Sequence, residues 1–211
     1  MAPEKTGERR VIHVIDDDEA LRESLAFLLR SAQLEVKSYA SARAFLDSLP
    51  DQSLSCVITD VRMPEVSGID LLRRLKELKI SVPVIVITGH GDVALAVEAM
   101  KIGAADFFEK PFDDDLLLAS VRSALRMQEG EKKRYAERAE IESRIAALSP
   151  RERDVLAGLV EGRANKQIAF DLGISPRTVE IYRANLMNKM QADSLSDLVR
   201  MALVAGMLDS A

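Results

Sequence analysis

The first 127 residues alternate short strand-like runs with longer amphipathic stretches, and this alternation restricts the fold more than any other feature. The strand-like runs cover residues 11–15, 34–38, 54–59, 84–87 and 105–109. Stretches with leucines at helical spacing, such as residues 69–79, separate them. Five strands that alternate with helices predict a doubly wound α/β fold, in which a five-stranded parallel sheet has right-handed crossovers and helices on both faces.

Four of the five runs end at residues that can take part in chemistry, and these residues are Asp16 to Asp18, Asp60, Thr88 and Lys110. The carboxyl ends of parallel strands share one edge of a sheet, which is where such folds bind ligands. We therefore expect side chains about a hundred positions apart to meet there. Asp60 stands out, because it directly follows the buried run 54–59.

Several carboxylates at one place repel one another unless a cation lies among them, and Mg²⁺ suits oxygen ligands of this kind. Carboxylates, a hydroxyl group and a lysine together at four strand ends predict phosphoryl transfer. Asp60 would attack a phosphorus atom, Mg²⁺ on Asp17 and Asp60 would offset charge, and Lys110 and Thr88 would bind the phosphoryl oxygens. Taken singly, Lys110 could equally form an ordinary ion pair and Thr88 could equally cap a helix. An acidic helix start explains Asp18 and Glu19 well, but it explains Asp60 and Lys110 poorly.

Composition predicts a soluble, cytoplasmic protein. Hydrophobic residues make up 47% and charged residues 30% of the chain, and no apolar run approaches the roughly 20 residues of a membrane span. The single cysteine, Cys56, falls in a strand-like run and is expected in the core. We expect His13 in a strand core and His90 in a loop.

Residues 128–147 are dense in alternating charges and have few apolar positions, so we interpret them as a helical linker between domains at 1–127 and 148–211. Two interpretations stay open for this linker. It is either a solvated helix or a coiled-coil contact between two chains. Gly130 is a candidate hinge.

Beyond Leu148, short helical stretches predict a small all-α domain. Ser149-Pro150-Arg151-Glu152 has the pattern of a capping box. A glycine-containing turn then joins two further helices, at residues 166–172 and from 176 onward, which describes a helix-turn-helix. Residues 163–190 carry five basic side chains against two acidic ones, a local excess that suits a phosphate backbone.

The first domain resembles the receiver domain of two-component response regulators, which have a CheY-like (flavodoxin-like) fold. The resemblance rests on Asp16-Asp17, Asp60 with Met63-Pro64 and Gly68, Thr88-Gly89-His90, and Glu109-Lys110-Pro111-Phe112. It implies that Asp60 accepts a phosphoryl group from a sensor histidine kinase. It also implies a Mg²⁺ or Mn²⁺ site completed by the Arg62 carbonyl, and Phe107 as the aromatic switch residue.

The second domain resembles the LuxR-type helix-turn-helix, on residues 148–153, 165–169, 175–180 and 185–190. One helical face should form the core, with Val179, Tyr182, Leu186 and Met190. The residues expected to bind DNA are Arg177, Glu180, Ile181, Ala184 and Asn188 for the major groove, Lys166, Arg183 and Lys189 for the phosphates, and Thr178.

Over nearly its full length the chain is similar to regulators of nitrogen-fixation and micro-oxic genes, which answer to a haem-containing, oxygen-sensing kinase. This similarity implies a transcriptional activator that is not an enzyme. We expect phosphorylation to draw Thr88 and Phe107 inward and to pair two receivers through residues 93–109, with promoter DNA and RNA polymerase as further partners.

Three alternatives remain. The same architecture answers another signal, the chain is a Mg²⁺-dependent aspartyl phosphohydrolase, or the helix-turn-helix is controlled by a small ligand. The hydrolase needs a second acid two residues after its nucleophile, and Arg62 occupies that position.

Overall fold

The computed structural model describes residues 10–49, 54–89 and 93–207. The chain divides into two compact units, Met1–Gly130 and Glu131–Ala211. The division falls a few residues after the expected end of the first domain at 127. His90, expected in a loop, lies outside the described residues.

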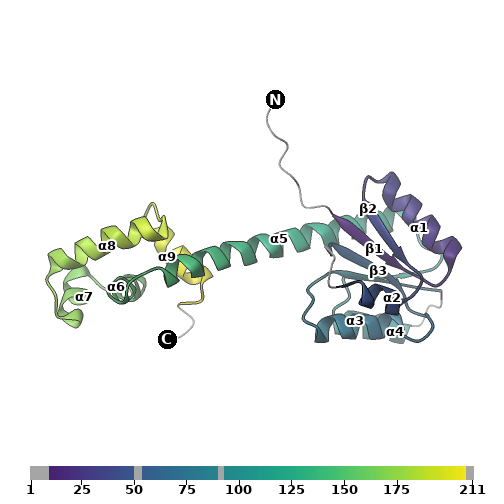
Figure 1. Cartoon of the computed structure of the whole chain (residues 1–211), viewed down its shortest axis with the longest axis horizontal. Coiled ribbons are helices and arrows are strands. Elements are labelled where there is room, and N and C mark those ends of the chain that lie inside the picture. The colour runs from purple at the N-terminus through teal and green to yellow at the C-terminus, as the bar shows by residue number, and fades with distance from the viewer. Residues whose placement is uncertain (1–9, 50–53, 90–92, 208–211) are drawn as a thin grey trace, which may run out of the picture. The chain divides into compact units, whose positions relative to one another are not determined.

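The first unit contains the predicted five-stranded sheet, and all four pairings between neighbouring strands are parallel. Its strands are β1 (Val11–Ile15), β2 (Glu35–Tyr39), β3 (Cys56–Asp60), β4 (Val84–Thr88) and β5 (Asp106–Glu109). They lie side by side in the order β2-β1-β3-β4-β5, of which Figure 1 labels β2, β1 and β3. This order confirms the doubly wound fold, because the chain moves outward from β1 in both directions.

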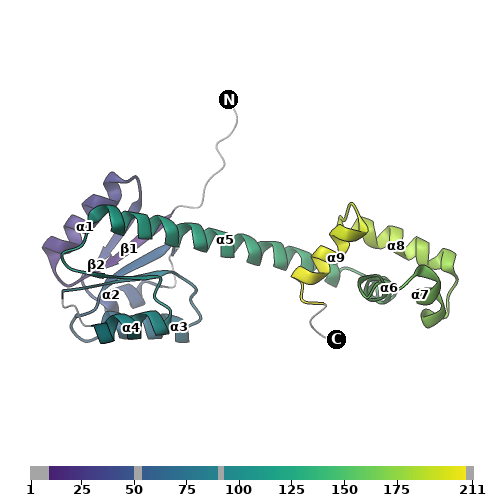
Figure 2. The same ribbon diagram turned by 180° about the vertical axis from the view of Figure 1, so that it is seen from behind.

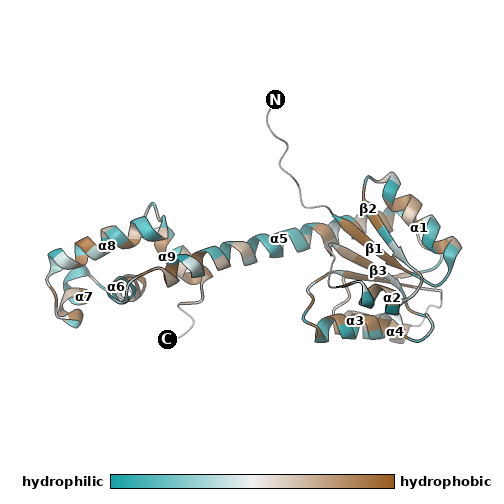
Figure 3. Cartoon of the chain, viewed as in Figure 1, coloured by the Kyte–Doolittle hydropathy of each residue, from teal (hydrophilic) through white to brown (hydrophobic). Residues whose placement is uncertain are grey.

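Helices cover both faces of the sheet (Figures 1 and 2). One face packs against α1 (Glu19–Ser31) and the first part of α5 (Asp114–Ala146). The other packs against α2 (Ala42–Asp47), α3 (Gly68–Glu77) and α4 (Val93–Ile102). The strands β1, β3 and β4 are buried at all five positions, which explains why their sequences show continuous apolar character (Figure 3).

Local capping sets where three of these helices begin. The side chains of Asp18, Ser41 and Ser67 each accept a hydrogen bond from a backbone N–H in the first turn of α1, α2 and α3. The acidic residues before α1 therefore do not all serve the same purpose. Asp18 caps the helix, which leaves Asp16 at the strand end free for another role.

Two polar side chains predicted for the core lie there. Cys56 is fully buried, and burial raises the pKa of its thiol to about 12, so the group stays protonated and packs as a small apolar residue. His13 is also fully buried, with Nδ1 3.2 Å from the hydroxyl oxygen of Tyr39 and its ring edge-on to Phe45. Both residues are part of the sheet's packing.

Helix α5 is longer than the sequence indicated. It runs without a break from Asp114 to Ala146, so the last helix of the first unit and the expected linker are one helix. Its first part buries Leu117, Val121 and Leu125 against the sheet, whereas all of residues 131–140 are exposed. The sequence changes from amphipathic to highly charged near residue 128, and in the structure this corresponds to a change from buried to exposed side chains within one helix.

The second unit is helical, with α6 (Pro150–Val160), α7 (Asn165–Leu172), α8 (Pro176–Met190) and α9 (Leu195–Val204). The predicted capping box begins α6, with both of its reciprocal hydrogen bonds present. Gly173 ends α7 with φ +66°, a left-handed conformation that favours glycine. Gly158 lets α6 and α7 approach, because a Cβ there would lie 2.8 Å from Ile168. Helices α7 and α8, joined by the turn at Gly173, form the predicted helix-turn-helix.

Among the described residues, no helix is both long and apolar enough to cross a membrane.

Candidate functional site

Asp60, Lys110 and Asp16 meet at the carboxyl edge of the sheet. Asp60 ends β3 with only 6% of the residue exposed, and its Oδ1 accepts a hydrogen bond from Lys110 Nζ at 2.5 Å. The same Nζ lies 3.0 Å from Oδ2 of Asp16, which follows β1. The ammonium group therefore bridges two buried carboxylates from different strands, as the strand-end argument predicted.

The second oxygen of Asp60 is held by the loop that follows it. Oδ2 accepts the backbone N–H of Arg62 at 2.5 Å, and Oδ1 of Asp16 accepts the backbone N–H of Asp18 at 2.9 Å. Each carboxylate is thus oriented by one backbone N–H and one shared lysine. Charge-assisted hydrogen bonds of this kind are short and strong, so the two side chains are preorganised.

The electrostatics of the cluster follow from burial and pairing. Burial raises the pKa of Asp16, more than the hydrogen bonds from the Asp18 backbone and from Lys110 lower it. Burial alone would lower the pKa of Lys110, but its hydrogen bonds to Asp60 and Asp16 outweigh this and raise it. Lys110 is therefore held in its charged form, facing the two carboxylates.

Thr88 and Phe107, the predicted switch residues, lie on β4 and β5. Thr88 ends β4 and is fully buried, and its carbonyl accepts the backbone N–H of Lys110 at 2.7 Å. Phe107, in β5, is half-buried and packs against the core cluster that includes Ala99 of α4. Thr88 therefore lies at the carboxyl edge of the sheet, and Phe107 belongs to the packing that includes α4.

Gly68 fixes the backbone behind Asp60. It begins α3, and its backbone N–H donates to the carbonyl of Val61 at 3.0 Å. A Cβ at Gly68 would lie 2.1 Å from the carbonyl oxygen of Asp60, far inside van der Waals contact. The sequence singled out this glycine as part of a motif, but the close approach that requires it is visible only in three dimensions.

The carboxylate oxygens at this edge are hard donors of the kind that Mg²⁺ prefers, and a single cationic group already spans Asp16 and Asp60. The predicted third acid, Asp17, is exposed and lines the adjoining cleft. In the part of the chain that the structure describes, no three His, Cys, Asp or Glu side chains are grouped so as to hold a metal ion. Asp16 and Asp60 fit a divalent cation by donor chemistry.

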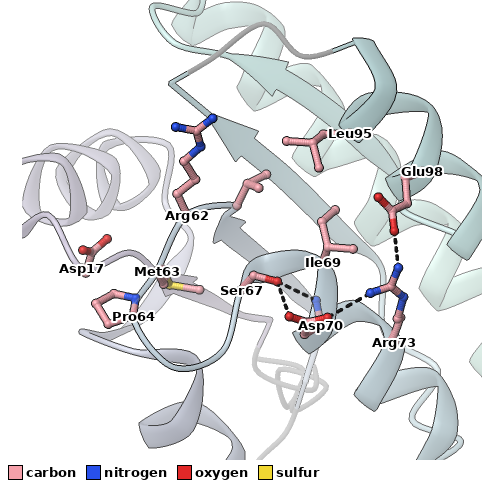
Figure 4. A pocket seen from close by; sticks show the side chains of 11 residues that line it. Asp17, Arg62, Met63, Pro64, Ser67, Ile69, Asp70, Arg73, Leu95 and Glu98 are labelled. Atoms are coloured by element: carbon pink, nitrogen blue, oxygen red, sulfur yellow. Dashed lines mark hydrogen bonds and ion pairs between the residues drawn. The ribbon is translucent and has the colours of Figure 1, made fainter.

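A cleft of about 720 Å³ lies beside Asp60, between the loop after β3 and helices α3 and α4 (Figure 4). Asp17, Arg62 and Met63 line one part of it (Figure 4). On the other, Arg73 of α3 pairs with Asp70 of its own helix at 2.9 Å and with Glu98 of α4 (Figure 4). This ion pair joins α3 to α4.

The predicted DNA-facing residues lie in the second unit, on α8 and at the start of α7. Val179, Leu186 and Met190 are buried and Tyr182 is half-buried, as expected for the core face of α8. The exposed residues of the predicted set are Lys166, Arg177, Glu180, Ile181, Ala184, Asn188 and Lys189, with Thr178 and Arg183 half-buried. Ile181 is 56% exposed, which is unusual for an isoleucine that serves packing alone.

Two members of that set have partners the sequence did not indicate. The Thr178 hydroxyl lies 2.8 Å from the hydroxyl of Ser175, the N-cap of α8. Lys189 Nζ lies 2.7 Å from Oε2 of Glu152, which is 4% exposed. The capping-box pattern identified Glu152 as a helix cap, but nothing in the sequence pointed from it to Lys189, 37 residues away. The α3–α4 pair Arg73–Glu98 likewise carries no sequence signal.

Comparison with known proteins assigns a different family to each of the two units. Residues 12–122 match the response regulator receiver domain family, and residues 146–202 match the bacterial regulatory proteins of the luxR family. The chain is 57% identical to the transcriptional regulatory protein FixJ of Bradyrhizobium diazoefficiens, over 94% of this chain and 97% of that one.

Solved structures give the same result. Full-length FixJ from B. japonicum is 55% identical, with a TM-score of 0.60 over 96% of this chain and all of that one. The response regulator StyR is 36% identical, with a TM-score of 0.83 over 93% of this chain and 99% of that one. Each similarity spans both units.

A receiver domain followed by a LuxR-type DNA-binding domain defines the class of two-component response regulators. Within that class, the chain belongs to the FixJ-like family of phosphorylation-dependent transcription regulators.

Proposed function

We propose that Asp60 accepts a phosphoryl group from a sensor histidine kinase and that this modification controls binding of promoter DNA by the second unit. The observation that carries the proposal is the buried Asp60 carboxylate, oriented by the Arg62 backbone N–H and paired with Lys110. A carboxylate held in this way is a nucleophile with a cation positioned for the group it receives.

In the proposed transfer, an oxygen of Asp60 attacks the phosphorus of a phosphohistidine. The P–O bond forms as the P–N bond breaks, and the electron pair of that bond stays on the imidazole nitrogen. Lys110 then moves its hydrogen bond to a phosphoryl oxygen, and the Thr88 hydroxyl donates to another. Mg²⁺ or Mn²⁺, held by Asp16, Asp17, Asp60 and the Arg62 carbonyl, would offset negative charge in the transition state.

The covalent product is proposed to act as a switch. Thr88 and Phe107 move toward the phosphoryl group, and the surface formed by residues 93–109 repacks and pairs with a second receiver. A near-complete change of state needs about 5 kcal/mol of preference for the active form. A phosphoryl group brings almost two negative charges and three acceptor oxygens, which can supply energy of that order.

Pairing of receivers would bring two helix-turn-helix units to half-sites about one helical turn apart. Helix α8 would enter the major groove with its exposed face, on which Arg177, Glu180, Ile181, Ala184 and Asn188 lie. Arg183 and Lys166 would contact phosphates, and Thr178 would support the helix start. The protein would act in the cytoplasm, where bacterial promoter DNA lies, together with RNA polymerase.

We further propose a FixL-like, oxygen-sensing haem kinase as the phosphodonor and nitrogen-fixation or micro-oxic genes as targets of activation, on the strength of the FixJ similarity. The alternative is the same architecture answering another signal. Phosphotransfer from a haem sensor kinase, with a reporter on candidate promoters, tests this assignment. Transfer only from an unrelated kinase would remove the oxygen assignment and leave the switch intact.

The switch itself is tested by sedimentation with beryllium trifluoride, a mimic of the phosphoryl group. We expect wild type to dimerise and Asp60→Asn to stay monomeric. Asp47→Asn, the same substitution at an exposed position of α2, is the matched control and should dimerise like wild type. Equal dimerisation of wild type and Asp60→Asn would exclude the proposed switch.

A further inference from the structure

Glu152 is a buried acid that the phosphorylation switch does not use. It lies in the first turn of α6, and its Oε2 accepts the backbone N–H of Ser149 at 2.7 Å. The same oxygen lies 2.7 Å from Nζ of Lys189. One carboxylate therefore joins the beginning of α6 to the last turn of α8, the helix proposed to enter the major groove.

A side chain of a second helix also holds the C-terminal end of α8. In addition to the Glu152–Lys189 pair, a guanidinium nitrogen of Arg144 donates to the carbonyl of Met190 at 2.9 Å. The chain then turns at Gln191, which ends α8 with φ +54°. Apolar burial of Val179 and Leu186 secures the helix against the core, and the two charged side-chain contacts add hydrogen bonds of defined direction at its C-terminal end.

We propose that Glu152 and Lys189 are positioning residues, which hold α8 in the orientation that DNA binding needs, and that Lys189 does not contact a phosphate. The inference rests on the proposed DNA-binding function and changes the predicted role of Lys189. Release of the lysine to a phosphate would leave the 4%-exposed Glu152 with a buried charge and one backbone donor. Breaking such a pair is strongly unfavourable, so the pair persists in the complex.

The salt dependence of binding separates a positioning role from a phosphate contact. Each phosphate neutralised by a protein cation adds about 0.9 to the slope of log affinity against log salt for B-DNA. Loss of a positioning residue lowers affinity with the slope unchanged, because the number of phosphate contacts stays the same. Loss of a phosphate contact lowers the slope by about one.

The experiment measures binding of the full, phosphorylated chain to a short B-DNA duplex of mixed sequence over a range of salt concentrations. Glu152→Gln keeps an acceptor for the Ser149 N–H but loses the ion pair, and Lys189→Met removes the ammonium. We expect each to weaken binding about tenfold, with the wild-type slope. The double variant should be about as weak as either single one, and Lys189→Arg should restore most of the affinity.

Lys166→Met is the matched control, because Lys166 is exposed on α7 and is proposed to contact a phosphate. It should lower the slope by about one. A lower slope for Lys189→Met, with unchanged binding by Glu152→Gln, would overturn the positioning role. If the wild type itself shows no salt-dependent binding, the DNA-binding function is wrong, and this assignment is wrong with it.

Discussion

Lys110 Nζ lies 2.5 Å from Oδ1 of Asp60, although 50 residues separate the two in the chain. The same nitrogen reaches Asp16, so one cation holds the carboxylates at the ends of β1 and β3. This contact makes Lys110 both a structural element of the resting receiver and the proposed ligand of the phosphoryl group.

Lys110→Met should destabilise the first unit, because it leaves two buried carboxylates without their common cation. A charged hydrogen bond contributes about 1.5–3 kcal/mol, and the partial exposure of the lysine favours the lower end of that range. Urea unfolding of the full chain, followed by circular dichroism, measures the loss. Lys101→Met, at an exposed position of α4, is the control and should be nearly neutral. Equal stability of both variants would contradict the bridging role.

Gly68→Ala and Gly130→Ala should have opposite effects. A Cβ at position 68 would meet the Asp60 carbonyl at 2.1 Å, so the backbone behind the phosphoacceptor must shift, at a cost of about 1–3 kcal/mol. Around a Cβ at position 130, in helix α5, there is nothing within 4 Å. That substitution should stabilise by about 0.5–1 kcal/mol. Thermal unfolding and the rate of Asp60 phosphorylation test the pair, and a silent Gly68→Ala would remove the steric argument.

Helix α4 should exchange its amide hydrogens faster than α3. Of α4 only Ala99 is fully buried among the described residues, whereas α3 buries Ile69, Leu71, Leu72 and Leu75. Hydrogen exchange by mass spectrometry measures the difference. Arg73→Ala, which removes the ion pair to Glu98, should speed exchange in α4 further, and the neighbouring Arg74→Ala should not. Equal protection of the two helices in wild type would contradict this account.

Glu152 should make the second unit sensitive to acid. Its hydrogen bonds from Lys189 and from the Ser149 backbone lower its pKa from the usual 4.5 to about 2. A lowered pKa in the folded state stabilises the fold fully above pH 4.5, and this contribution is lost as the pH falls from 4.5 toward 2. Thermal unfolding of wild type and Glu152→Gln should therefore differ most above pH 4.5 and converge toward pH 2.

The control for this titration is Glu161→Gln, which alters an exposed acid that pairs with Arg163 at the surface. It should have little effect at any pH, because exposed ion pairs contribute about 0–1 kcal/mol. A difference between wild type and Glu152→Gln that stays constant from pH 5 to pH 2.5 would show that the carboxylate's charge is not the stabilising feature.

Much of the first unit could be predicted because its signals are local. The continuous apolar runs indicated β1, β3 and β4. The alternation with helices predicted a parallel sheet and the shared edge where Asp16, Asp60 and Lys110 meet. The strand bounds differ from the predicted ones by one or two residues, and Asp60 and Thr88 belong to their strands instead of following them.

What could not be predicted depends on distances between elements far apart in the chain. Gly68 is required by the Asp60 carbonyl, and Lys189 is paired with Glu152 from another helix. Neither relationship leaves a periodic or compositional trace in the sequence. The continuity of α5 was missed for a different reason. Residues 128–147 were predicted as a separate helical linker from their charges, and residues 131–140 have no buried face, so no apolar pattern continues from the first part of α5 to show that the two are one helix.

The most direct test of the central claim is the mass of the protein after incubation with a sensor kinase or a small acyl phosphate in the presence of Mg²⁺. Wild type and Asp47→Asn should each gain the mass of one phosphoryl group, and peptide mapping should assign it to Asp60. Asp60→Asn should gain none. A phosphoryl group on Asp60→Asn at the wild-type level, or one mapped to another residue of the wild type, would contradict the account.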